Sequence, residues 1–100
     1  MAEHAWVYLL RCADGSLYCG WTVDVERRVA AHEAGRASRY TASRRPVALA
    51  VALPMPDRSA ARREEARIKR LPRAAKLALV AAASPRGRAA ARRSRRTGAT

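Results

Sequence analysis

Two pairs of side chains in this sequence could do proton-transfer or phosphate chemistry. Tyr8 and Tyr18 lie in two short apolar runs near the start of the chain, and Arg28 and His32 follow further along, four residues apart. A phenol or an imidazole can exchange protons, and a guanidinium offers a fork of N–H donors to a phosphate. The same residues also have ordinary structural roles. A tyrosine in a strand commonly packs its ring against the core and leaves its hydroxyl in solvent. An arginine can extend from an apolar stripe into solvent.

The charge balance points to a polyanion as the partner of this chain. The sequence has 21 Lys and Arg against 8 Asp and Glu, a formal net charge of +13. Six arginines fall in residues 84–100, and the remaining 15 basic against 8 acidic residues still leave +7. A domain that is basic by its own composition favours nucleic acid as the partner.

Cysteine usage and hydropathy predict a cytoplasmic protein. No stretch approaches about 18 uncharged apolar residues, so no transmembrane helix is expected. The first residues lack the basic and then apolar runs of a secretory signal. Cys12 and Cys19 are too few for a zinc site, which takes four ligands, and in a reducing cytosol we expect two free thiols.

The first two elements read as a β-hairpin around an Asp-Gly turn signal. A two-residue loop would place Tyr8 and Tyr18 on opposite faces of the hairpin. A three-residue loop, with Gly15 in the left-handed conformation, pairs Leu10 with Tyr18 and makes the two tyrosines diagonal neighbours on one face. Composition alone leaves both registers open.

The residues after the hairpin are expected to form an amphipathic helix that ends at about Ala34. Thr22 or Asp24 would cap its start, and Gly35 would stop it. At 100° per residue, Arg28 and His32 flank the stripe of this helix that should be buried, whereas Arg27 points to solvent.

The remaining sequence completes an α+β domain over residues 1–83. We expect a small three-stranded antiparallel sheet flanked by helices, with strands near residues 5–12, 16–21 and 47–53. Prolines should end the third strand, and a basic loop over residues 36–46 should precede it. Two further helices are expected, from Asp57 or Ser59 to about Arg70 and over residues 72–83. Residues 84–100 hold no bulky apolar residue and are expected to be a disordered, arginine-rich tail.

Several motifs together resemble the GIY-YIG nuclease domain. Val7-Tyr8 and Tyr18-Cys19-Gly20 match its paired half-motifs. Residues 24–32 resemble its helix, which carries an arginine and a further site residue one turn later, here Arg28 and His32. Residues 65–69 and 71–76 resemble later helices of the small, stand-alone bacterial branch of that family. The resemblance covers about residues 5–80.

This resemblance implies a phosphodiester hydrolase with one divalent ion, Mg²⁺ or Mn²⁺. It implies that two tyrosines and a helix arginine surround the scissile phosphate, which favours the three-residue hairpin loop. It also implies that a glutamate holds the ion, and one carboxylate can suffice because Mg²⁺ keeps several waters. The resemblance selects Glu65 as that ligand, although helix geometry does not exclude Glu64. The expected catalytic residues are Tyr8, Tyr18, Arg28, His32 and Glu65.

The expected function is therefore endonuclease cleavage of DNA, branched or single-stranded, of the kind used in repair or recombination. Basic and aromatic residues outside the catalytic set are expected to bind the nucleic acid: Arg36, Arg39, Tyr40, Arg44 and Lys69. Two alternatives stay open. One is a binding module with the same fold and no catalysis, and the other is a basic protein that associates with RNA or the ribosome.

Overall fold

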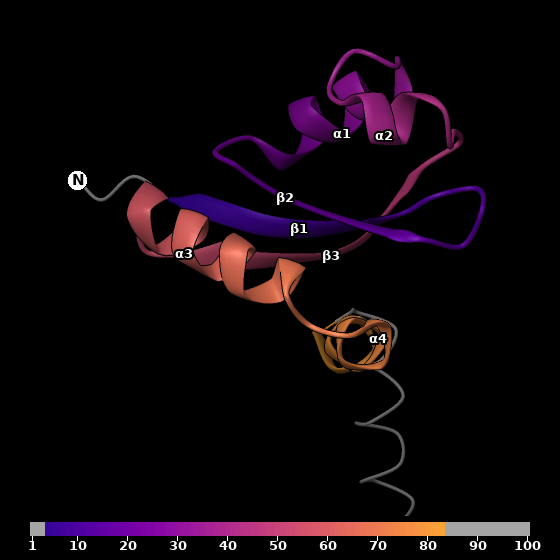
Figure 1. Cartoon of the computed structure of the whole chain (residues 1–100). Coiled ribbons are helices and arrows are strands. Elements are labelled where there is room, and N and C mark those ends of the chain that lie inside the picture. Colours follow the sequence, from indigo (N-terminus) through magenta and orange to yellow (C-terminus); the bar gives the residue numbers. More distant parts are fainter. Residues whose placement is uncertain (1–3, 84–100) are drawn as a thin grey trace, which may run out of the picture.

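The computed structural model of this chain describes residues 4–83. The expected α+β class and the antiparallel three-stranded sheet are confirmed (Figure 1). The predicted tail, residues 84–100, lies outside the described residues. The elements, in chain order, are β1 (Ala5–Arg11), β2 (Leu17–Thr22), α1 (Val25–Glu33), α2 (Arg39–Ala42), β3 (Ala48–Met55), α3 (Arg58–Lys69) and α4 (Arg73–Ala83).

The hairpin adopts the three-residue loop. Leu10 pairs with Tyr18 and Tyr8 with Gly20, so the two tyrosines lie diagonally on one face of the sheet. Gly15 has φ +84°, in the left-handed region, which glycine adopts without steric strain because it has no Cβ. The register expected from the family resemblance is therefore the one that the chain adopts.

The sheet has the strand order β2-β1-β3 and a helical layer on each face (Figure 1). On one face the larger apolar core joins β1 to α3 and α4: Ala5, Val7, Leu9, Cys19, Val51, Ala61, Ile68 and Val80. On the other face, beneath α1 and α2, Leu10, Cys12 and Val47 form a smaller cluster. Alternation along β1 thus separates the main apolar core from the face that carries Tyr8.

Asx caps start the two longer helices that follow strands. The Asp24 carboxylate accepts from the Arg27 amide at the start of α1, and Asp57 accepts from the Ala60 amide at the start of α3. Of the caps that the sequence left open, Asp24 and Asp57 are the ones used. Among the described residues, no helix is long and apolar enough to cross a bilayer.

Two boundaries differ from the sequence prediction. Strand β3 continues through Pro54 to Met55 instead of ending at the proline, because β3 is an edge strand and loses no central ladder bond there. The expected basic loop contains the short helix α2, since Ser38 caps it by accepting from the Thr41 amide.

Candidate active site

A hydrogen-bonded chain of buried side chains lies between the sheet and α1. The Tyr8 hydroxyl and His32 Nε2 are 2.8 Å apart, and His32 Nδ1 lies 2.7 Å from Thr41 Oγ1. Tyr8, His32 and Thr41 are each exposed by 1% or less. The helical spacing that put His32 beside the apolar stripe thus buries its ring against β1, and both ring nitrogens have partners.

The second motif tyrosine packs against the same group of rings. The Tyr18 ring centroid lies 5.0 Å from that of His32 and 6.4 Å from that of Tyr8, both in edge arrangements. Tyr40 of α2 stacks on Tyr18 at 5.9 Å. Edge and offset stacking are the arrangements that aromatic rings prefer, so these contacts fix where the Tyr18 hydroxyl can lie.

Burial and neighbouring charges set the protonation states at this site. Burial, then the Tyr18 and Glu65 charges, raise the pKa of Tyr8 far above its ordinary value, while Arg28 acts in the opposite direction. Burial and then Arg28 lower the pKa of His32. At neutral pH the site therefore holds a protonated phenol and a neutral imidazole.

Arg28 lines two adjoining hollows near the start of α1. One has a volume of about 460 Å³ and is also lined by Arg27 and Arg36, and the other has about 340 Å³ and is also lined by Arg58. A third hollow beyond Arg36 is lined by Arg39. We call this run of hollows, from Arg58 through Arg28, Arg27 and Arg36 to Arg39, the arginine groove.

The two tyrosines share a face, as expected, but Tyr8 does not open to these hollows. Its ring is buried, and the residues that line the arginine groove include Arg28 and neither tyrosine. Tyr18 is half-buried. The Tyr8 hydroxyl is therefore closed off from the arginine groove in this structure.

The two adjacent glutamates of α3 differ in their surroundings. Both carboxylate oxygens of Glu64 accept from Arg67, at 2.8 and 2.7 Å, and this hydrogen bonding lowers the pKa of Glu64. Among residues 4–83, the one ion pair of Glu65 is a 3.5 Å contact with Lys69; the Glu65 side chain is 22% exposed, and its charge acts on Tyr8. Of the two glutamates, Glu65 is therefore the one whose carboxylate oxygens remain available to bind a metal ion.

A hard divalent cation fits the donor chemistry at Glu65. Mg²⁺ is often held by one or two carboxylates plus water and substrate oxygens. Within residues 4–83 no group of three or more His, Cys, Asp or Glu gathers as a metal cage. Cys12 and Cys19 are free and buried, and burial raises the pKa of the Cys19 thiol to about 11, so that thiol stays protonated.

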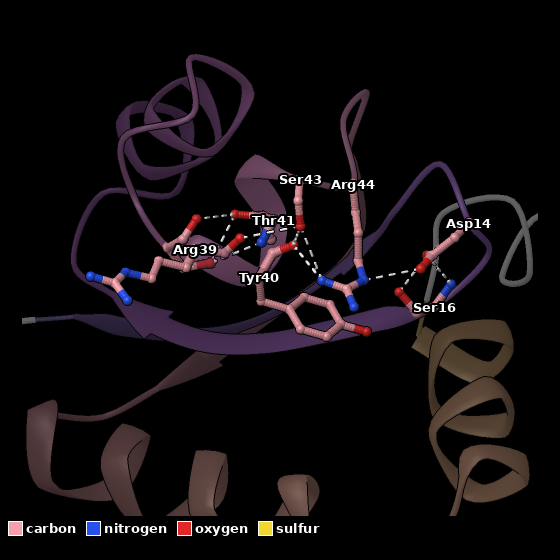
Figure 2. Close-up of polar contacts among 8 residues, drawn as sticks. Asp14, Ser16, Arg39, Tyr40, Thr41, Ser43 and Arg44 are labelled. Atoms are coloured by element: carbon pink, nitrogen blue, oxygen red, sulfur yellow. Dashed lines mark hydrogen bonds and ion pairs between the residues drawn. The ribbon is translucent and has the colours of Figure 1, made fainter.

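The predicted nucleic-acid-binding residues fall into two groups. Arg36 and Arg39 are exposed and line the arginine groove. Arg44 instead lies over the Tyr40 ring at 3.8 Å and donates from Nε to Asp14 at 3.0 Å, as Figure 2 shows. Lys69 is held by Glu65. The Arg44–Asp14 ion pair thus ties the segment after α2 to the hairpin turn.

Sequence reasoning missed Thr41, Ser38 and the steric role of Gly20. Thr41 looked like one polar residue in a basic loop, although a serine three residues before it is a common sign of a capped turn. Gly20 faces Tyr8 so closely that a Cβ there would lie 2.5 Å from the phenol oxygen. Only the strand pairing reveals that contact.

The fold is that of a small α+β domain, and comparison with known proteins identifies its family. The profile of the GIY-YIG catalytic domain matches residues 4–78, so the chain belongs to the GIY-YIG family.

Stand-alone proteins of similar size resemble the chain in sequence and in structure. A UPF0213 protein of Nitratidesulfovibrio vulgaris is 53% identical over 81 residues, covering 80% of this chain and 74% of the relative. A UPF0213 protein of Natronomonas pharaonis is 49% identical over 81 residues, covering 81% and 95%. The solution structure of a UPF0213 protein from Bacillus halodurans matches with a TM-score of 0.55 at 38% identity, covering 84% of this chain and 90% of that one.

Proposed function

We propose that this protein is an endonuclease that hydrolyses DNA phosphodiester bonds with one bound Mg²⁺ or Mn²⁺. The observation that carries the proposal is the 2.8 Å hydrogen bond between the Tyr8 hydroxyl and His32 Nε2, beside Arg28. A buried tyrosine paired with a neutral histidine is a proton-transfer unit, and membership of the GIY-YIG family gives that unit its substrate class.

In this proposal, Tyr8 and His32 manage the proton of the attacking water. The phenol proton passes to His32 Nε2, and the resulting phenolate accepts a proton from water as the water attacks the phosphorus. The bond from phosphorus to the leaving sugar oxygen breaks in the same step. That oxygen takes up a proton from solvent, and His32 releases the proton that it received. The raised pKa of Tyr8 opposes this transfer, and the Arg28 charge favours it by stabilising the phenolate. Tyr18, packed edge-on to His32, would donate its hydroxyl to a phosphate oxygen.

Arg28 and Glu65 would meet the phosphate from two sides. The guanidinium offers a fixed pair of N–H donors to the charge that develops on the phosphate oxygens. Glu65 would hold the divalent ion, which supplies Lewis-acid stabilisation of the same charge. Its carboxylate must exchange the 3.5 Å contact with Lys69 for the ion.

The arginine groove would hold the DNA backbone on either side of the scissile phosphate. Its arginines come from α1, from the loop after it and from the first residues of α2 and α3. Asp24 is the one acidic residue among those that line the three hollows. Such a path neutralises successive phosphates without reading bases. We expect low sequence selectivity from this domain and place its use in DNA repair or recombination.

The test is a nicking assay on linear and branched DNAs with Mg²⁺, Mn²⁺ or EDTA. Cleavage should need the ion, and Tyr8→Phe should lose roughly 10²–10⁴-fold in rate, the usual worth of a positioned acid–base group. Arg63→Gln, an exposed residue of α3, serves as the control variant. Cleavage that persists in EDTA, or that Tyr8→Phe leaves unchanged, contradicts the proposal.

One observation favours a second candidate, a nucleic-acid-binding module without catalysis. The Lys69 ammonium already neutralises Glu65, the carboxylate on which the ion depends. For a pure binding module, DNA affinity would be the same with Mg²⁺ or EDTA, and no nicking would accompany it.

A further inference from the structure

The hydrogen-bonded chain that starts at Tyr8 continues beyond His32 into α2. Thr41 Oγ1 lies 2.7 Å from His32 Nδ1 and 2.9 Å from Ser38 Oγ, and it is 3.4 Å from the Ser38 carbonyl oxygen. The Ser38 hydroxyl also accepts from the Thr41 amide at 3.1 Å. Thr41 is fully buried, so its hydroxyl has no access to bulk water as a substitute partner.

The available donors and acceptors determine the direction in which these hydrogen bonds are donated, from Tyr8 toward Ser38. The buried Tyr8 hydroxyl is protonated and must donate, and His32 Nε2 is the acceptor within reach. A neutral histidine that accepts at Nε2 carries its hydrogen on Nδ1. That N–H then donates to Thr41 Oγ1, and the Thr41 hydroxyl donates onward to Ser38, at Oγ or at the carbonyl oxygen. Each hydrogen has one acceptor in this arrangement.

The opposite direction of donation would leave the Tyr8 hydroxyl without an acceptor. If His32 carried its hydrogen on Nε2, it would donate to the Tyr8 oxygen, and the Tyr8 hydrogen would need another buried acceptor. Within residues 4–83 every buried side-chain polar atom has a hydrogen-bond partner, and His32 is the partner of Tyr8. The first arrangement satisfies the phenol and the second does not.

We propose that Thr41, supported by Ser38, is a positioning residue that fixes His32 as the Nδ1–H tautomer and so keeps Nε2 free to accept the Tyr8 proton. The inference rests on the proposed function for its catalytic meaning, but the tautomer itself is a property of the resting protein. Because Thr41 is fully buried, it would act on the reaction through His32.

The choice of a hydroxyl instead of a carboxylate has a chemical consequence. A carboxylate on Nδ1, as in the Ser-His-Asp triad, would favour the charged imidazolium. A neutral hydroxyl orients the ring with no such charge, so His32 stays uncharged until a proton arrives. The titratable or charged groups that face His32 are Tyr8 from β1, Tyr18 from β2 and Arg28 from its own helix.

The direct test is long-range ¹H–¹⁵N NMR of the ring nitrogens in the full-length protein. The chain has 2 histidines, His32 and the exposed His4, so assignment is simple and His4 serves as an internal reference. In the wild type, His32 should show a protonated Nδ1 and an unprotonated Nε2. Thr41→Val keeps the shape, removes the acceptor and should shift His32 toward the Nε2–H tautomer, while Thr41→Ser should keep the Nδ1–H form.

Cleavage kinetics supply the second measurement. Thr41→Val should lower the rate at saturating DNA roughly 10- to 100-fold, as removal of an orienting partner typically does, and Thr41→Ser should restore most of it. DNA affinity in EDTA should not change in either variant, and Ser38→Ala should show a smaller effect than Thr41→Val.

The two measurements separate the possible failures. An Nδ1–H tautomer that persists in folded Thr41→Val overturns the role of Thr41, whatever the cleavage rate. A wild-type protein with the expected tautomer and no cleavage under any metal condition overturns the proposed nuclease function and leaves Thr41 as the residue that sets the His32 tautomer.

Discussion

Gly20 lies directly opposite Tyr8 in the β1–β2 ladder, and any side chain there would collide with the phenol. A Cβ at Gly20 would stand 2.5 Å from the Tyr8 oxygen and 2.6 Å from the ring carbon that bears it. The glycine of the second half-motif is therefore required by the space that the tyrosine of the first half-motif occupies. The two half-motifs are one packing unit.

Gly20→Ala should displace the Tyr8 ring and break its hydrogen bond with His32. We expect a loss of about 1–3 kcal/mol in the free energy of unfolding, typical of overpacking, together with a large loss of cleavage. Chemical denaturation and the nicking assay measure the two effects.

The collision needs both partners, which provides the control. Combining Gly20→Ala with Tyr8→Leu should cost less stability than the sum of the single variants, because the smaller side chain leaves room for the new methyl group. Additive losses would mean that Gly20 acts through the backbone and not through Tyr8.

Glu65→Gln should abolish metal-dependent cleavage and leave DNA affinity in EDTA equal or slightly tighter. Removing the carboxylate removes the proposed ligand of the ion and releases Lys69, and it takes away no contact to phosphate. The loss should be roughly 10²–10³-fold or more. Glu64→Gln is the matched control, since both oxygens of Glu64 are engaged by Arg67. If Glu64→Gln is the inactive variant, the assignment to Glu65 is wrong.

Neutralising arginines in the groove should weaken DNA binding more than neutralising the same number elsewhere. Arg27→Gln with Arg36→Gln removes two charges that line the groove, while Arg62→Gln with Arg63→Gln removes two from the exposed side of α3. The first pair should flatten the log–log salt dependence on duplex DNA by about 0.9 per lost phosphate contact. Equal losses for both pairs would show that net charge alone drives binding.

Acidification should destabilise the protein through His32. Burial and Arg28 lower the pKa of His32 in the folded state, whereas an unfolded histidine titrates near 6.5. The unfolded state therefore takes up the proton first, and stability falls as the pH drops below about 6.5 toward the folded pKa. Thermal unfolding between pH 7.5 and 5 should show this slope in the wild type and a flatter one in His32→Gln. An unchanged slope in that variant would assign the effect to other groups.

Deleting residues 84–100 should weaken DNA binding at low salt and leave the cleavage rate at saturating DNA within a small factor. The six arginines of that segment add charge without aromatic residues for stacking, and the proposed catalytic residues all precede it. An unchanged salt dependence would show that these arginines do not contribute to DNA binding, and loss of folding would show that the segment belongs to the domain.

Local signals were enough to predict the sheet, the hairpin turn and the helix that carries Arg28 and His32. Asp-Gly, the Asx caps and the apolar periodicity each depend on a few neighbouring residues. The hairpin register needed more, because one loop residue decides whether Tyr8 and Tyr18 share a face.

Contacts between distant segments were not predictable in this way. His32 meets Thr41 through the packing of α1 on α2, and Arg44 reaches Asp14 across 30 residues of sequence. Strand β3 crosses Pro54 because it is an edge strand, which depends on the strand order and not on its own residues.

The alternation of β1 has a consequence for how the sequence can change over time. Val7 and Leu9 point into the apolar core, and Tyr8 points into the site. Adding or removing one residue in this strand would turn every later side chain over, sending a phenol into the core and an aliphatic group into the site. We therefore expect β1 to tolerate substitutions between similar side chains, and to tolerate neither insertions nor deletions.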